Sequence, residues 1–115
     1  MPEIKRIGNA GRWSDIVIHH NVARWVEVAG DLTMDAASQV SQVLHQIDET
    51  LVQIGSDRTQ LLQIMIYLAD LEDVAALNAA WDSWVLSGHA PIRACVQAGL
   101  QGTCLVEMVI SAAVP

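Results

Sequence analysis

The feature that most constrains the fold is an amphipathic helix predicted over residues 35–54. Its inward face carries apolar side chains at intervals of three and four residues: Ala36, Val40, Val43, Leu44, Ile47, Leu51 and Ile54. Its other side carries polar ones: Gln39, Gln42, Gln46, Asp48, Glu49 and Gln53. Thr33 or Asp35 can cap its start, and Gly55 suits the left-handed position after its end. A helix of this length spans about 30 Å, the width of a small domain.

Shorter patterns predict strands and one more helix. The strands cover residues 15–20, 23–29, 61–69, 91–98 and 103–113, with a short leading strand at 3–7. A turn lies near Asn21. Residues 61–69 are apolar on both alternating faces, as in a strand covered on both sides. Asp70 is predicted to cap the second helix, whose inward stripe is Val74, Leu77, Trp81, Trp84 and Val85.

The element order β-β-α-β-α-β-β predicts one α+β domain over residues 1–115, a sandwich of one sheet with two helices on one face. Hydrophobic residues make up 52% of the chain before its seven glycines are added, whereas ordinary domains reach about 45–50% with glycine included. Two helices cannot cover both faces of such a sheet. The uncovered face is therefore predicted to be buried by oligomerisation.

Charge and composition exclude several function classes. Thirteen acidic residues against six basic ones give a formal net charge of −7, and this field repels phosphate backbones, so nucleic acid is an unlikely partner. The chain shows no apolar stretch of about 18 residues and no signal peptide, which argues against a membrane partner. Its two cysteines are too few for a disulfide framework, so we expect reduced thiols in the cytoplasm.

Two charged residues interrupt uncharged strands near the C-terminus. Arg93 lies in PIRACVQA, where a planar guanidinium would bind a carboxylate or form an internal ion pair. Glu107 lies in CLVEMVISAA, where it must be exposed, paired or functional. If the last two strands form a hairpin with an odd loop, both side chains share a face, with backbones about 7–8 Å apart. With an even loop they point to opposite faces.

Other candidates carry a weaker signal. No histidine has a partner at metal-ligand spacing, and no nucleophile triad, phosphate loop or dinucleotide fingerprint occurs, so we expect neither metal nor cofactor. Cys95 could be a nucleophile, but no activating base is identified, and a small strand residue is the preferred interpretation. Trp13 could form the wall of a pocket.

Three long segments resemble the RidA/YjgF family of enamine/imine deaminases: QVSQVLHQIDETLVQIGS, LLQIMIYLADLEDVAALNAAWDSWV, and APIRACVQAGL followed by LVEMVISAA. GHAPIRACVQAGL and the tryptophan doublet are similar to the YoaB-like branch. The resemblance implies a chorismate-mutase-like fold and a homotrimer with clefts between subunits. It also implies hydrolysis of 2-imino and 2-enamino acids, such as 2-aminoacrylate or 2-iminobutyrate, to 2-oxo acids and ammonia. It implies that the reaction needs no cofactor or metal.

The resemblance also implies roles for individual residues. Arg93 would hold the substrate carboxylate, the backbone at Cys95 would contact the substrate nitrogen or its surroundings, and Glu107 would hold the attacking water. Trp13 and Gly30 would complete the substrate-binding residues. The chain departs from the family pattern at two of these places.

A Ser-Gly-Gln-like run of active members reads Ala29-Gly30-Asp31 here, and a tyrosine of the family is replaced by Trp13. Both pocket hydroxyls are thus absent, and Asp31 would repel an acidic substrate if it faced the cleft. These losses favour an alternative, a non-catalytic trimer that binds a small carboxylate as a sensor or accessory protein. The retained Glu107 favours the deaminase.

Overall fold

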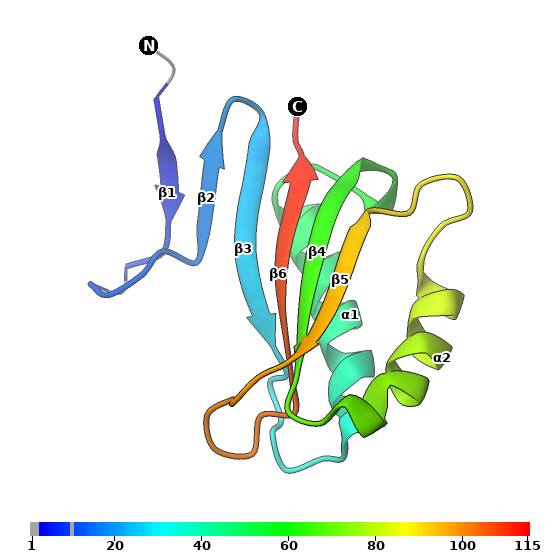
Figure 1. Ribbon diagram of the computed structural model, residues 1–115. Coiled ribbons are helices and arrows are strands. Elements are labelled where there is room, and N and C mark those ends of the chain that lie inside the picture. The colour runs from blue at the N-terminus through cyan, green and yellow to red at the C-terminus, as the bar shows by residue number, and fades with distance from the viewer. Residues whose placement is uncertain (1–2, 10) are drawn as a thin grey trace.

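The computed structural model describes residues 3–9 and 11–115, which form one six-stranded sheet with two helices against one of its faces (Figure 1). The strand order is β1-β2-β3-β6-β4-β5. The strands are β1 (Lys5–Ile7), β2 (Ile16–His19), β3 (Val22–Val28), β4 (Leu61–Leu68), β5 (Ile92–Gln97) and β6 (Val106–Ala113). The helices are α1 (Ala36–Gln53) and α2 (Val74–Trp84). A short 3-10 turn, η1 (Arg58–Gln60), precedes β4, and a second, η2 (Leu71–Asp73), precedes α2. The predicted α+β sandwich is confirmed.

The ends of the helices follow their capping residues. The Asp35 carboxylate accepts a hydrogen bond from the Ser38 backbone N–H at the start of α1, and Gly55 adopts a φ of 74° beyond its end, as predicted. Asp70 also caps, but its carboxylate accepts from the Glu72 N–H and so starts η2. The prediction that Asp70 caps the second helix is therefore wrong. α2 begins at Val74, and its N-cap residue is Asp73.

The last two strands do not form a hairpin, so that prediction is wrong. β5 pairs with β4 in parallel, while β6 lies between β3 and β4 and runs antiparallel to both. Burial distinguishes the two strands: four side chains of β6 are fully buried on the helix side, as suits a central strand, whereas Ile92 and Val96 of β5 are exposed, as suits a strand at the edge of the sheet. The connection over residues 98–105 is long enough to pass the end of β4 (Figure 1).

The core lies between the sheet and the helices. Its largest fully buried members include Ile47, Leu51, Ile64, Leu77 and Met108. On the opposite, open face, no helix packs in the described part of the chain, and apolar side chains remain exposed there: Val26, Val28, Ile92 and Val96. Within the same described residues, no helix is long and apolar enough to cross a membrane.

Candidate functional site

Arg93 lies on β5, the edge strand, and its side chain faces the helices. Its cross-strand neighbour is the core residue Ile64, which fixes this orientation. The guanidinium Nη2 donates to Asn78 Oδ1 of α2 at 2.8 Å, and its central carbon lies 5.2 Å from the ring centroid of Trp81. Within the described residues no acidic side chain is at ion-pair distance, so the alternative of an internal ion pair is wrong. The positive charge and most of its five N–H donors are left for a ligand.

Glu107 lies near the start of β6 and faces the open side of the sheet. Its cross-strand neighbours are Val28 of β3 and Tyr67 of β4, and its side chain is half-buried. In the described part of the chain, its carboxylate takes part in no ion pair or side-chain hydrogen bond. An unpartnered carboxylate of this kind can accept a hydrogen bond or a proton from a water molecule.

The two residues point away from one another within one chain. Arg93 is in register with Ile64 on the helix side, whereas Glu107 is in register with Tyr67 on the open side. Two strand spacings and three residues along β4 separate their backbones, about 10 Å in each direction. The expectation of a shared face therefore fails with the hairpin on which it depended. One small ligand cannot touch both side chains of the same copy.

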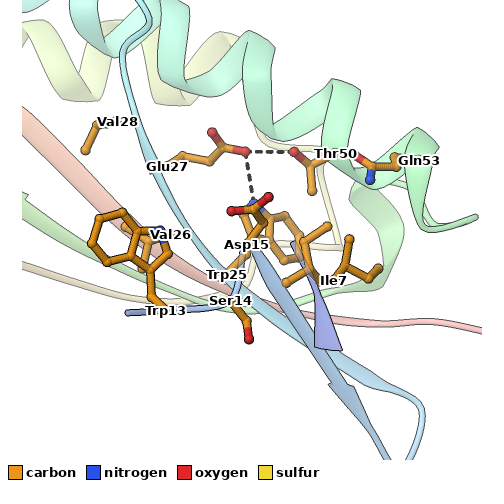
Figure 2. A pocket seen from close by; sticks show the side chains of 11 residues that line it. Ile7, Trp13, Ser14, Asp15, Trp25, Val26, Glu27, Val28, Thr50 and Gln53 are labelled. Atoms are coloured by element: carbon orange, nitrogen blue, oxygen red, sulfur yellow. Dashed lines mark hydrogen bonds between the residues drawn. The ribbon is translucent and has the colours of Figure 1, made fainter. Parts of the chain in front are cut away.

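A cavity of about 550 Å³ lies at the free edge of β3 (Figure 2). We name it the Trp13 cavity. Trp13, Val26 and Val28 form one side of it, Asp15 and Glu27 add carboxylates, and Thr50 and Gln53 of α1 close another side. The Trp13 side chain is 65% exposed, so its ring is available to a ligand or a neighbouring copy.

Glu27 is held firmly in the wall of the Trp13 cavity. Its Oε1 accepts from Thr50 Oγ1 at 2.7 Å and from Trp25 Nε1 at 3.2 Å (Figure 2). Its Oε2 accepts from Gln46 Nε2 at 3.1 Å. All three donors are neutral. The hydrogen bonds fix the carboxylate in position but leave its negative charge without a cation.

Comparison with known proteins identifies the chain over nearly its whole length. The family profile described as Endoribonuclease L-PSP matches residues 3–114. The chain belongs to this family, also called YjgF/RidA. It is 47% identical over 112 residues to the RutC family protein YoaB of Escherichia coli K12, covering 96% of this chain and 98% of the relative.

Two crystal structures show the same fold. An uncharacterized protein of Pseudomonas aeruginosa is 39% identical, with a TM-score of 0.93 over 98% of this chain and all of that one. NMB1025 of Neisseria meningitidis, a member of the YjgF protein family, is 35% identical, with a TM-score of 0.90 over 98% and 96% of the two chains. The family resemblance read from the sequence is thus confirmed.

In this YjgF/RidA member the loop that carries Gly30 is held by glutamines of α1. Gln46 accepts from the Gly30 N–H at 2.8 Å and donates to the Val28 carbonyl at 2.7 Å. Gln42 accepts from the Asp31 N–H at 3.0 Å. The Gly30 N–H is thus already bonded, and a ligand at this position would contact other atoms of that glycine.

The helical pattern predicted these glutamines on the polar side of α1 and missed what they bind. Gln39 is fully buried: its Nε2 donates to the carbonyls of Met34 and Thr103 at 3.0 Å each, and its Oε1 accepts from the Leu105 N–H at 2.9 Å. It joins the loop before α1 to the segment that enters β6. The spacing of three and four residues among the glutamines was the only signal in the sequence.

Hydrogen bonds at Asp31 and burial at Cys95 shift the pKa of each group away from neutral pH. The Asp31 carboxylate accepts from the Thr33 hydroxyl at 2.6 Å and from its N–H at 3.0 Å, and these bonds lower the pKa of Asp31. Burial raises the pKa of the Cys95 thiol, opposed by the charge of Arg93. The thiol is therefore protonated at neutral pH, which argues against a nucleophilic role.

Proposed function

We propose that this protein hydrolyses reactive 2-imino and 2-enamino acids, such as 2-aminoacrylate or 2-iminobutyrate, to 2-oxo acids and ammonia. The reaction would take place without a cofactor, in clefts between the subunits of a homotrimer. The observation that carries the proposal is the pair of unneutralised groups, Arg93 and Glu107, retained in a YjgF/RidA chain. Both thiols are free, which is compatible with action in the cytoplasm.

A second copy is needed to complete the site. Arg93 and Glu107 face opposite sides of one sheet, so a substrate that touches both must lie between Arg93 of one copy and Glu107 of another. The apolar open face, with Ile92 69% exposed, supplies a surface that association would cover.

Arg93 is suited to bind the substrate carboxylate. Its planar guanidinium can donate two parallel hydrogen bonds to the two carboxylate oxygens. Asn78 and Trp81 already restrict it, one by a hydrogen bond and the other by its ring face, so little side-chain freedom is lost when the substrate binds. The carboxylate anchor then orients the imine carbon, which is the electrophile, towards the neighbouring copy.

Glu107 is suited to activate water. As the water oxygen bonds to the imine carbon, one water proton passes to the Glu107 carboxylate, the C=N electron pair moves to nitrogen, and Glu107 passes that proton on to the nitrogen. In the resulting carbinolamine the Glu107 carboxylate takes the hydroxyl proton while the C=O bond forms. The C–N bond breaks as Glu107 delivers this second proton to the nitrogen, so that ammonia leaves and the carboxylate is regenerated. Water and imino acid are consumed, and oxo acid and ammonia are formed.

The alternative is a non-catalytic trimer that binds a small carboxylate. The specific observation in its favour is the loss of two pocket hydroxyls, with Ala29 and Trp13 at their positions. Binding would use Arg93 alone and would not need Glu107. The family description also names an endoribonuclease, but a net charge of −7 and the two carboxylates of the Trp13 cavity oppose the binding of RNA.

One experiment separates these functions. An amino-acid oxidase generates 2-iminobutyrate, and its decay is followed with wild type, Arg93→Ala and Glu107→Gln. We expect Glu107→Gln to lower kcat by about 10²–10⁴-fold and Arg93→Ala to lower kcat/KM by about 10–100-fold. Calorimetry with 2-oxobutyrate measures binding separately. Wild-type decay equal to the protein-free control, together with binding that depends on Arg93, would establish the non-catalytic alternative instead.

A further inference from the structure

The Trp13 cavity lies beside Glu107, and no step of the hydrolysis described above uses it; of its lining residues, the family resemblance gives only Trp13 as a substrate-binding residue. β2 is paired with β3 only as far as Trp25, so residues 26–28 form a free edge that opens into the cavity. Val28 lines the cavity and is also the cross-strand neighbour of Glu107 on the same face. Side chains directly opposite in this way have Cβ atoms about 4.5–5.5 Å apart. The cavity thus begins within one side-chain length of the proposed site of water attack.

The cavity is lined mainly by apolar side chains, together with two carboxylates. Trp13, Trp25, Val26 and Val28 supply aromatic and aliphatic surface. The charged groups among its described lining residues are Asp15 and Glu27, both negative, and the hydrogen bonds to Glu27 come from neutral donors. A volume of about 550 Å³ is in the range of pockets that enclose whole small molecules. A methyl or ethyl side chain would leave most of this space empty.

We infer that the Trp13 cavity receives the side chain of the substrate, and that the preferred substrates are 2-imino acids with bulky apolar or aromatic side chains. This inference rests on the proposed hydrolytic function. Each buried methylene group strengthens binding about fourfold, so leucine- and phenylalanine-derived imines gain over the alanine-derived one. A second carboxylate in the side chain would meet the charges of Asp15 and Glu27 and be rejected.

The test measures kcat/KM for imines produced in situ by amino-acid oxidases from alanine, leucine, phenylalanine and glutamate, with the remaining imine trapped by semicarbazide. We expect the leucine- and phenylalanine-derived imines to exceed the alanine-derived one by at least about tenfold. The glutamate-derived imine should be the poorest of the four. These comparisons use the wild-type protein alone, so they do not depend on the folding of any variant.

Three variants assign the preference to the cavity. Trp13→Ala should lower the ratio of phenylalanine-derived to alanine-derived kcat/KM by at least about fivefold. Asp15→Asn and Glu27→Gln should each raise the relative rate on the glutamate-derived imine, and the exposed Asp15 is the safer substitution for folding. Val52→Ala, an exposed apolar residue of α1 outside this cavity, is the control and should leave the ratio unchanged.

The outcomes distinguish this inference from the function on which it rests. Hydrolysis of all four imines at equal efficiency, or a preference for the alanine-derived one, would overturn the inference and leave the hydrolase intact. A preference for bulky imines that Trp13→Ala does not reduce would also overturn it, because another surface would then select the side chain. If the protein hydrolyses none of the four imines, the proposed function itself is refuted.

Discussion

Replacement of Gln39 by leucine should destabilise the protein strongly, although leucine is the better helix former and more apolar. The substitution keeps the approximate volume but removes the amide that joins the loop before α1 to the segment before β6. The Leu105 N–H and the carbonyls of Met34 and Thr103 would lose their bonds, which are 2.9, 3.0 and 3.0 Å long. A buried polar group left without a partner costs about 1–3 kcal/mol.

At about 1–3 kcal/mol each, the loss of these three shortest bonds sums to about 3–9 kcal/mol. We expect a decrease of about 3–4 kcal/mol in the free energy of unfolding, at the lower end of that sum, because both loops can admit some water. For a chain of this length 1 kcal/mol corresponds to about 4 °C in Tm, so Tm should fall by about 12–16 °C. Urea unfolding followed by circular dichroism measures the free energy, and calorimetry measures Tm. Gln53→Leu, at an exposed position of the same helix, is the matched control and should change the stability by less than about 0.5 kcal/mol.

A second substitution at this position adds a pH test. Gln39→Glu retains an acceptor for the Leu105 N–H but places an ionised oxygen against the Met34 and Thr103 carbonyls. Burial and these carbonyls should raise the pKa of the new carboxyl above its ordinary value of about 4.3. The destabilisation should therefore be large at pH 7 and shrink as the pH falls through the raised pKa, because the protonated acid can donate again.

One outcome would contradict the reasoning about Gln39. A Gln39→Leu protein whose free energy of unfolding lies within about 1 kcal/mol of the wild-type value would show that the amide does not hold the two loops.

Three further predictions concern other parts of the molecule. Val96→Lys, on the exposed open face, should dissociate the proposed trimer, so that light scattering gives the 12.5 kDa of one chain where wild type is expected to give about three times that mass. Arg58→Ala removes an ion pair with Asp48 at 2.9 Å and a bond to the Trp84 carbonyl at 2.7 Å, and should lower the unfolding free energy by about 1–2 kcal/mol in urea titrations. Because burial raises the pKa of both thiols, iodoacetamide at pH 8 should alkylate Cys95 and Cys104 more slowly than in urea-unfolded protein, as mass spectrometry can measure; equal rates would refute this.

The sequence predicts those features of the fold that depend on neighbouring residues. The apolar spacing over residues 35–54, the cap at Asp35 and the left-handed Gly55 all act within a few residues, and all three are confirmed. The alternation in β3 is confirmed as well, with Ala23 and Trp25 buried and Val26 exposed on the other face. Such features are determined by backbone geometry that a short segment carries by itself.

Features that depend on distant segments are not contained in the local pattern. Two adjacent strands with glycines between them favour a hairpin, yet β6 pairs with β3 and β4, which lie far earlier in the chain. Likewise, a glutamine on the polar side of a helix has the same local pattern whether it meets water or, as Gln46 does, the backbone of another loop. The Trp13 cavity combines residues from 7 to 53 and could not be read from any single segment.

The opposed directions of Arg93 and Glu107 lead to the most direct test of the proposed site. If each cleft takes Arg93 from one copy and Glu107 from its neighbour, then neither an Arg93→Ala nor a Glu107→Gln trimer contains an intact cleft. Unfolding and refolding an equal mixture of the two variants forms mixed trimers, because both carry the same interfaces. An intact cleft needs the Glu107→Gln chain on the arginine side and the Arg93→Ala chain on the glutamate side, which random assembly gives at about one site in four.

The activity of the refolded mixture should accordingly recover to about a quarter of the wild-type value per site, while each variant refolded alone keeps only its own residual activity, at most about a tenth of the wild-type value. A cleft built from both residues of one copy predicts no recovery, since every chain in the mixture lacks one of the two groups. The strand register makes the first result the expected one: the core residue Ile64 beside Arg93 and the open-face Tyr67 beside Glu107 lie on opposite sides of β4. Wild-type chains refolded in the same way measure the loss due to refolding, and a mixture that stays inactive beside an active wild-type control would refute the shared cleft.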